Sequence, residues 1–157
     1  MAIDQLMKKD PVVCQAADSL NEAARIMWEH DCGFVPVVDA ERKVVGVITD
    51  RDICMCAYTR GADLMVLRVS DAMSTLVRSC KPGDTLASAE NTMEGAQVRR
   101  LPVVDDEARL IGILSLSDLA RRSGRARKGD GAPSEAEIGH VLSAISQPRE
   151  LAATSVA

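Results

Sequence analysis

The chain has 157 residues and a formal net charge of −4, from 19 Lys and Arg against 23 Asp and Glu. This balance gives no overall positive field for nucleic acid or an anionic membrane, and no stretch is apolar for long enough to span a bilayer. Aromatic residues make up only 2%, and the five cysteines include no Cys-x-x-Cys pair, so we expect an aliphatic core, thiols that mostly act as small buried hydrophobes, and a reducing cytoplasm.

The first half of the chain predicts a strand and a helix, followed by a hairpin and a second helix. Apolar residues at helical spacing follow the capping-box pattern of Ser19 and Glu22, and Trp28 falls on the same stripe. Two β-branched runs around a polar turn then favour an antiparallel hairpin, after which Thr49 is a helix cap. In order, we expect a short helix at 3–7, a strand at 12–14, a helix at 19–31, strands at 34–38 and 44–48, and a helix from 49 to about 58.

The second half repeats the first at a constant offset. Pro102 follows Pro36, and Gly112 follows Gly46, by the same distance, because 102 − 36 and 112 − 46 both equal 66. A single repeat would bury little apolar surface, so the two are expected to pack through the apolar faces of their hairpins. The second repeat predicts a strand at 76–80, a helix from 84 to 95, strands at 98–104 and 110–114, and a helix from 115 to about 123.

These patterns divide the chain into two similar units and a tail. Within the tail, Ser134 and Glu137 match a capping box that opens a short helix over 134–146. Such a helix is too short to persist alone, so it should dock on the body or on a partner, or fray, and the end from Gln147 is expected to be disordered. The predicted divisions are a first unit at 1–60, a polar joint at 61–68, a second unit at 69–123, and a linker and tail at 124–157.

Each unit carries a hydroxyl residue at a strand-to-helix junction and an aspartate three positions later. These pairs are Thr49 with Asp52, and Ser115 with Asp118. Unpaired N–H groups and the helix dipole favour an anion at such a junction, while the carboxylate matches vicinal ribose hydroxyls. The same pattern is also a common helix start without a ligand, but its recurrence beside an apolar-Pro-Val-Val-Asp strand in both units favours a ribonucleotide site.

The paired motifs resemble a tandem of CBS domains, named after cystathionine beta-synthase and together called a Bateman module, over roughly residues 2 to 123. The resemblance implies an α+β fold of the CBS type, in which two β-α-β-β-α repeats form a pseudo-two-fold pair through their sheets. It also implies a cytoplasmic regulatory protein, often a homodimer, that binds adenine nucleotides in clefts between the repeats. AMP, ADP and ATP are the expected ligands, S-adenosylmethionine and NAD are weaker candidates, and no cofactor is required.

The resemblance places ligand contacts at matching positions of both repeats. The two aspartates would hold ribose hydroxyls, and the two hydroxyl residues would reach phosphate. The strand segments at each proline would flank the base, and the early strands would contribute backbone contacts to adenine. The candidate ligand-binding residues are Val13, Phe34, Val35, Pro36, Thr49, Arg51, Asp52, Ser79, Cys80, Arg99, Arg100, Leu101, Pro102, Ser115 and Asp118.

The two sites are expected to differ in charge. Arg100 stands two residues before Pro102, with Arg99 beside it, and either guanidinium group could clamp a phosphate. Phe34 takes the corresponding place in the first repeat, where phosphate attraction would have to come from Thr49, from Arg51 or from the opposite repeat. The alternative interpretation of the two neighbouring arginines is a solvated edge strand.

The leading hypothesis is a regulatory module without catalysis, since no nucleophile-base pair, metal constellation or Gly-rich phosphate loop can be assembled from the sequence. The alternative is a ligand-free module for dimerisation or protein interaction, which would engage another protein through the tail helix. Nucleic acid is disfavoured as a partner, because the one basic cluster lacks interleaved aromatic residues and a solvated helix end explains it better. That cluster consists of Arg121, Arg122, Arg125, Arg127 and Lys128.

Overall fold

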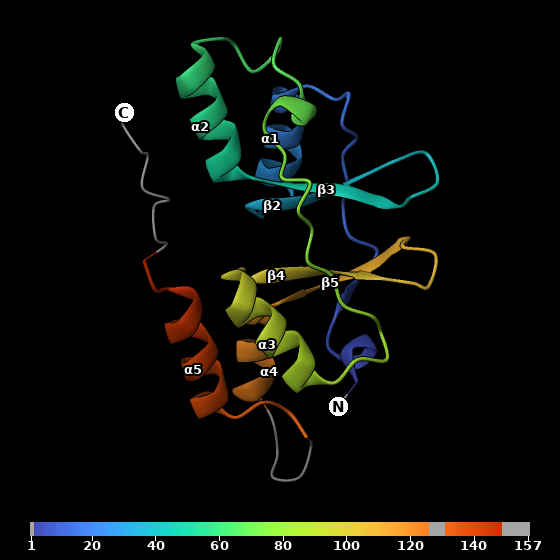
Figure 1. The fold of residues 1–157 in the computed structure, drawn as a ribbon, viewed down its shortest axis with the longest axis vertical. Helices are drawn as coiled ribbons and strands as arrows, with labels where there is room; N and C mark the ends of the chain where they lie inside the picture. The colour runs from blue at the N-terminus through green and yellow to red at the C-terminus, as the bar shows by residue number, and fades with distance from the viewer. Residues whose placement is uncertain (1, 126–130, 149–157) are drawn as a thin grey trace, which may run out of the picture.

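The computed structural model describes residues 2–125 and 131–148, and it is built as two similar halves stacked through their β-hairpins (Figure 1). The first half contains α1 (Leu20–Glu29), β2 (Phe34–Val38), β3 (Val44–Thr49) and α2 (Asp50–Arg60). The second half contains α3 (Leu86–Ala96), β4 (Arg100–Val104), β5 (Leu110–Ser115) and α4 (Leu116–Ser123). The remaining elements are η1 (Ile3–Gln5), β1 (Lys8–Lys9), η2 (Val69–Asp71) and α5 (Glu135–Ile145).

This arrangement confirms the predicted α+β fold with two repeats packed through their sheets. In each half two helices cover the outer side of the hairpin, and the hairpins face each other in the middle of the molecule (Figure 1). No helix among the described residues is long and apolar enough to cross a membrane. The predicted disorder beyond residue 148, and two members of the basic cluster, Arg127 and Lys128, lie outside the described residues.

The first hairpin is buried on both of its faces. All five residues of β2 are buried, although successive side chains of a strand point to opposite sides. Val35 and Val37 belong to the core under α1 and α2. Phe34, Pro36 and Val38 therefore face the other half, which is the contact expected between the repeats.

Two backbone hydrogen bonds tie the hairpin turns of the two halves together. The N–H of Val44 donates to the carbonyl of Ala108 at 3.2 Å, and the N–H of Leu110 donates to the carbonyl of Arg42 at 3.0 Å. Adding 66 to positions 42 and 44 gives 108 and 110, so the two bonds join equivalent positions of the two repeats. The two halves are thus related by a pseudo-two-fold axis, and this pair of reciprocal backbone hydrogen bonds follows that symmetry.

The strands predicted at 12–14 and 76–80 do not form, and each segment makes only one parallel bridge to a neighbouring strand. The cause is the proline in that neighbour. The N–H of Cys14 donates to the carbonyl of Pro36 at 3.2 Å, but extending the bridge towards the N-terminus would need an N–H on Pro36 itself, which proline lacks. Pro102 stops the second segment in the same way.

The segment that opens each repeat packs in the opposite half of the molecule. β1 pairs with β5, and Ile3 is buried in the core under α3 and α4. The corresponding segment around η2 brings Val69 and Met73 to the core under α1 and α2. The sequence does not indicate this exchange, because β1 consists of two exposed lysines and carries no apolar pattern.

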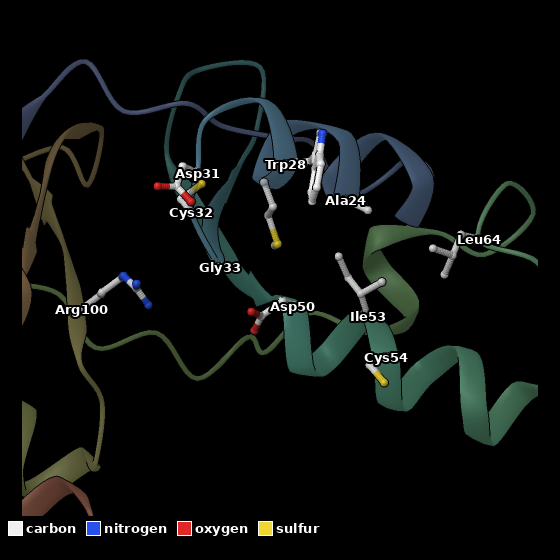
Figure 2. Close-up of a pocket in the computed structure, with 11 residues that line it drawn as sticks. Ala24, Trp28, Asp31, Cys32, Gly33, Asp50, Ile53, Cys54, Leu64 and Arg100 are labelled. Atoms are coloured by element: carbon white, nitrogen blue, oxygen red, sulfur yellow. The ribbon is translucent and has the colours of Figure 1, made fainter.

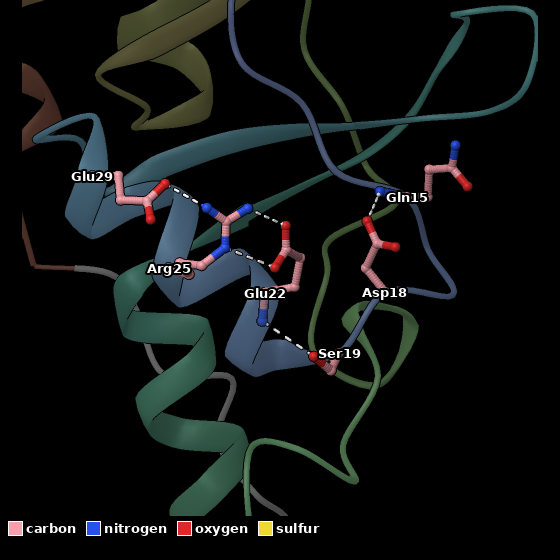
Figure 3. A network of polar contacts seen from close by, with 6 residues as sticks. All are labelled: Gln15, Asp18, Ser19, Glu22, Arg25 and Glu29. Carbon is pink, nitrogen blue, oxygen red and sulfur yellow. Dashed lines mark hydrogen bonds and ion pairs between the residues drawn. The ribbon is translucent and has the colours of Figure 1, made fainter.

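α1 begins at its predicted cap, but it differs from expectation in two respects. Ser19 Oγ accepts the N–H of Glu22 at 3.1 Å, whereas the Glu22 carboxylate pairs with Arg25 instead of returning to the cap, so the capping box is incomplete (Figure 3). Arg25 also pairs with Glu29 one turn further on. Trp28 is 88% exposed rather than buried, because it lies one position, or about 100°, beyond the stripe that faces the core.

The predicted tail helix is confirmed as α5, and it docks against α3 and α4 (Figure 1). Ser134 and Glu137 form the complete capping box at its start. Val141 and Ile145 are buried in the core of the second half. Docking also covers Glu90 of α3, which is 9% exposed and whose Oε1 has no hydrogen-bond partner among the described residues.

We expect the contact between β5 and β1 to be intolerant of a larger side chain. A Cβ on Gly112 would lie 2.6 Å from Met7 Sδ and 3.0 Å from the carbonyl oxygen of Lys8, so Gly112→Ala should lower the free energy of unfolding by about 1–3 kcal/mol. In the control Gly95→Ala, nothing lies within 4 Å of the added Cβ, and the helix should gain about 0.5–1 kcal/mol. Urea unfolding measures both changes, and equal effects would contradict the close approach.

We expect Glu90 to weaken the fold near neutral pH. Burial, Glu137 and Glu94 raise the pKa of Glu90, so its stabilising contribution is complete below the ordinary pKa and is lost as the pH rises through the raised value. Glu90→Gln should raise the midpoint of thermal unfolding at pH 7 by about 2–6 °C and have little effect at pH 4. Calorimetry at both pH values checks this, with Glu107→Gln in an exposed turn as the control.

Candidate functional site

The candidate site lies where the second strand of each hairpin runs into a helix. Phe34 is opposite Thr49 in the first ladder, and Arg100 is opposite Ser115 in the second. The guanidinium carbon of Arg100 lies 5.9 Å from the centroid of the Phe34 ring, so the two ladders meet at this end. The structure therefore brings four predicted site residues from both repeats to one place.

The first motif forms a complete capping box at the start of α2. Thr49 Oγ1 accepts the N–H of Asp52 at 3.2 Å. Asp52 Oδ2 accepts in return from the N–H of Thr49 at 2.9 Å and from its hydroxyl at 2.7 Å. The cap uses one carboxylate oxygen, so a ligand hydroxyl would find the other oxygen, Oδ1, outside the cap.

The second motif has similar geometry and an additional cation. Ser115 Oγ donates to Asp118 Oδ2 at 2.5 Å and accepts the Asp118 N–H at 3.0 Å. Oδ1 of Asp118 pairs with Arg121, one turn further along α4. A ligand hydroxyl would therefore compete with Arg121 for Asp118, whereas Asp52 forms no ion pair with the described residues.

A cavity of about 610 Å³ extends from the site along the groove between α1 and α2 (Figure 2). Arg100 reaches this cavity from the second half, while Asp31 and Asp50 lie at the same end in the first half (Figure 2). Its volume is in the range of small-molecule binding sites. The cavity is lined by Ala24, Met27, Trp28, Asp31, Cys32, Gly33, Asp50, Ile53, Cys54, Leu64 and Arg100.

A smaller cavity of about 270 Å³ lies at the start of α4 and is bordered by α5. Arg99 and Arg100 both line it, and Arg100 also borders the larger cavity. The two cavities therefore differ in the charged residues that line them, since the larger one has two aspartates and one arginine and the smaller one has two arginines. The smaller cavity is lined by Arg99, Arg100, Leu116, Ser117, Ala120, Ile138 and Leu142.

The remaining candidate residues differ in which atoms they can offer to a ligand. The side chains of Val35 and Leu101 are fully buried in the two helix-side cores, so only their backbone can face a cleft between the halves. Cys80 is also buried, with its Sγ 4.0 Å from the carbonyl of Pro102. Val13, Arg51, Ser79 and Arg99 are exposed or partly exposed, and Pro36 and Pro102 are buried.

The acidic mouth of the larger cavity, formed by Asp31 and Asp50, is not among the site residues predicted from the sequence. The N–H of Asp50 donates to the carbonyl of Gly33 at 3.3 Å, and a Cβ on Gly33 would lie 2.6 Å from Asp50 Oδ2. Glycine therefore leaves room for this carboxylate. Their positions in the sequence could have indicated these two residues. Gly33 directly precedes Phe34 and Asp50 directly follows Thr49, so both lie next to the paired ends of the first ladder.

The cysteines are free thiols, and they differ widely in burial. Burial is the largest cause that raises the pKa of Cys14 to about 12 and that of Cys80 to about 11, and nearby carboxylates add to it. These two thiols therefore remain protonated near neutral pH. Within residues 2–125 and 131–148, no group of three or more His, Cys, Asp or Glu side chains is placed to hold a metal ion.

Two stacked hairpin repeats with paired helix starts at a shared cleft define the class of this protein as a tandem-repeat domain pair. The profile of the CBS domain family matches residues 3–57 and 69–125, which together are more than half of the chain. The chain therefore belongs to the CBS domain family and contains two CBS domains.

Curated relatives of two kinds match the chain. The CBS domain-containing protein YhcV of Bacillus subtilis is 38% identical over 117 residues, which cover 71% of this chain and 81% of that protein. The inosine-5'-monophosphate dehydrogenase of Methanocaldococcus jannaschii is 35% identical over 119 residues, or 76% of this chain. The chain spans only 23% of the length of that enzyme.

Solved structures of CBS domain pairs are similar over most of this chain. The CBS domain pair of protein MJ0100, in complex with 5-methylthioadenosine and S-adenosyl-L-methionine, is 26% identical with a TM-score of 0.72, covering 81% of this chain and 98% of that one. CBSX2 in complex with AMP is 25% identical with a TM-score of 0.69, covering 79% of this chain and 96% of that one. Adenosine-containing ligands therefore occur in two proteins with this fold.

We expect the thiols to react in two groups. Cys54 is exposed and Cys32 is partly exposed, whereas Cys14 and Cys80 are buried and have raised pKa values, so few of their thiolates exist at pH 8. Ellman's reagent should modify Cys54 and Cys32 in the native protein, and the buried thiols only after unfolding. Peptide mapping by mass spectrometry identifies the modified residues, and rapid native modification of Cys14 or Cys80 would contradict the assigned burial.

Proposed function

We propose that this protein is a cytoplasmic regulatory module that binds an adenine nucleotide between its two CBS domains and has no catalytic activity of its own. The observation that carries the proposal is the meeting, at one end of the hairpins, of Thr49, Ser115 and Arg100. Capped helix starts and a guanidinium group both favour phosphate. The CBS domain pairs solved with AMP and with S-adenosyl-L-methionine support an adenosine ligand.

In the proposed complex, each part of the nucleotide meets a different part of the site. A ribose would place its hydroxyls at Asp52, whose Oδ1 lies outside the cap, or at Asp118 in exchange for Arg121. The base would lie against backbone beside Pro36 and Pro102, because the neighbouring strand side chains point into the cores. AMP, ADP and ATP fit this division better than S-adenosylmethionine or NAD.

The phosphate is expected to lie on the side of the second repeat. Arg99 and Arg100 both border the smaller cavity, while Asp31 and Asp50 would repel a phosphate at the mouth of the larger one. Because Arg100 borders both cavities, a ligand in either of them would lie beside this residue. We therefore propose that the two sites bind nucleotides with different affinity.

A second candidate function is a ligand-free module for dimerisation and protein interaction. The surface of α1 and α2 exposes three large side chains, Trp28, Met55 and Tyr58, and exposed apolar patches often mark interfaces. We propose that this surface forms a homodimer. Such a dimer would be compatible with either function, so ligand binding is the property that separates the two.

We expect the two aspartates to be needed for nucleotide binding. Charge-assisted hydrogen bonds are strong, so Asp52→Ala or Asp118→Ala should weaken the binding of AMP at its own site by roughly ten- to a hundredfold. Asp106→Asn is the control, because it changes an exposed turn carboxylate that pairs with Lys81. Isothermal titration calorimetry measures all three variants, and unchanged affinity in both aspartate variants would refute the assigned site.

A thermal-shift panel separates the sensor from the ligand-free module. A ligand that binds only the folded state stabilises it by RT ln(1 + [L]/Kd), so AMP, ADP or ATP at millimolar concentration should raise the unfolding midpoint by several degrees. S-adenosylmethionine and NAD complete the panel. No shift with any of the five, together with a dimer in sedimentation velocity, would favour the interaction module.

A further inference from the structure

α5 covers a groove that the other half of the molecule leaves open. The helix lies outside both ranges matched by the CBS domain family, and it packs on α3 and α4 through Val141 and Ile145. In the first half, no described helix covers the equivalent groove between α1 and α2, which forms the larger cavity. Each repeat therefore forms such a groove between its two helices, and α5 is an additional helix that fills the groove of the second repeat.

The covered groove contains a carboxylate without a partner. Glu90 follows Ala24 by 66 positions, and Ala24 lines the open groove of the first half, so Glu90 faces into the covered one. Glu90 is 9% exposed, and its Oε1 accepts no hydrogen bond from the described residues. Because buried polar atoms are normally satisfied, the groove lacks one donor.

α5 does not supply this donor. The charged groups near Glu90 are Glu137 from α5 and Glu94 from α3, and both disfavour its ionised form in addition to burial. Glu137 accepts hydrogen bonds from Ser134 at the start of the helix. Nε2 of His140 on α5 lies 3.7 Å from Oε1 of Glu94, not beside Glu90. The apolar side chains of α5 suit the groove, whereas its charges do not.

We propose that the groove between α3 and α4 is a binding site for an amphipathic helix of another protein that places a Lys or Arg opposite Glu90, and that α5 fills the groove until such a helix displaces it. An ammonium or guanidinium group would supply the missing donor through a charge-assisted hydrogen bond. The α5 helix of a second copy is a poorer occupant than such a partner, because it brings the same Glu137 to the groove.

Displacement of α5 would also change the proposed nucleotide site. Ile138 and Leu142 of α5 line the smaller cavity together with Arg99 and Arg100. Removing these two side chains would open one wall of that cavity, so helix binding and anion binding would each alter the affinity of the other. The groove itself does not depend on the proposed nucleotide function, since its argument uses α3, α4 and α5 alone.

Two labelled peptides test the proposal on the full chain. Both have the sequence of residues 134–147, and one carries Glu137→Lys. Fluorescence anisotropy should show that the lysine peptide binds the unaltered protein roughly tenfold more tightly, even though it loses its capping carboxylate. In the Glu90→Gln protein this preference should vanish or reverse, because the capping difference alone remains. Only the ratio of the two affinities within one protein is compared.

A loosened variant shows whether the peptides bind in the groove of α5. Val141 is buried, so Val141→Ala should weaken α5 docking and tighten the binding of both peptides by roughly tenfold. Equal affinities for the unaltered protein, or a lysine preference that persists in Glu90→Gln, would overturn the proposal. Absence of binding to Val141→Ala at millimolar peptide would also overturn it. If sedimentation velocity shows a dimer and either peptide dissociates it, the groove would instead be assigned to the α5 helix of a second copy.

Discussion

Each hairpin of this molecule must be covered on both faces, and most of the structure depends on that requirement. A two-stranded hairpin is marginal alone in water, and here neither β2 nor β4 has a side that could be left to solvent. The helices of each repeat cover one face, and the hairpin of the other repeat covers the second face (Figure 1). The backbone bonds between Val44 and Ala108, and between Leu110 and Arg42, fix how the two hairpins meet.

The candidate site is a consequence of that stacking. Both helices α2 and α4 start at the same end of the paired hairpins, so two sets of capping groups and the Arg100 side chain come together without any dedicated loop. Capping and ligand binding draw on the same carboxylates. Asp52 keeps one oxygen outside its cap, while Asp118 shares its second oxygen with Arg121, so a ligand would meet two related but unequal acceptors.

The features predicted correctly from the sequence are the local ones. The hairpins and the caps at Thr49 and Ser134 rest on residue spacing within about a dozen positions, and the repeat is visible because the same local motifs recur 66 positions apart. Two failures are local, namely the exposure of Trp28 and the incomplete capping box at Ser19, and the others involve contacts between distant segments. The missing strand at 12–14 depends on Pro36 in a neighbouring strand, and nothing near β1 indicates that it pairs with β5. The residues that line the cavities come from both halves, so only the motifs beside the cavities could be predicted from the sequence.

The exchange of opening segments sets the order in which the chain can complete its fold during synthesis. The first half can close once the residues around η2 have been made, since they complete the core under α1 and α2. Ile3 and β1 must wait until β5 and the core under α3 and α4 exist. The N-terminal segment is therefore synthesised first but packs last, and its contacts with β5 join the second half of the molecule to the beginning of the chain.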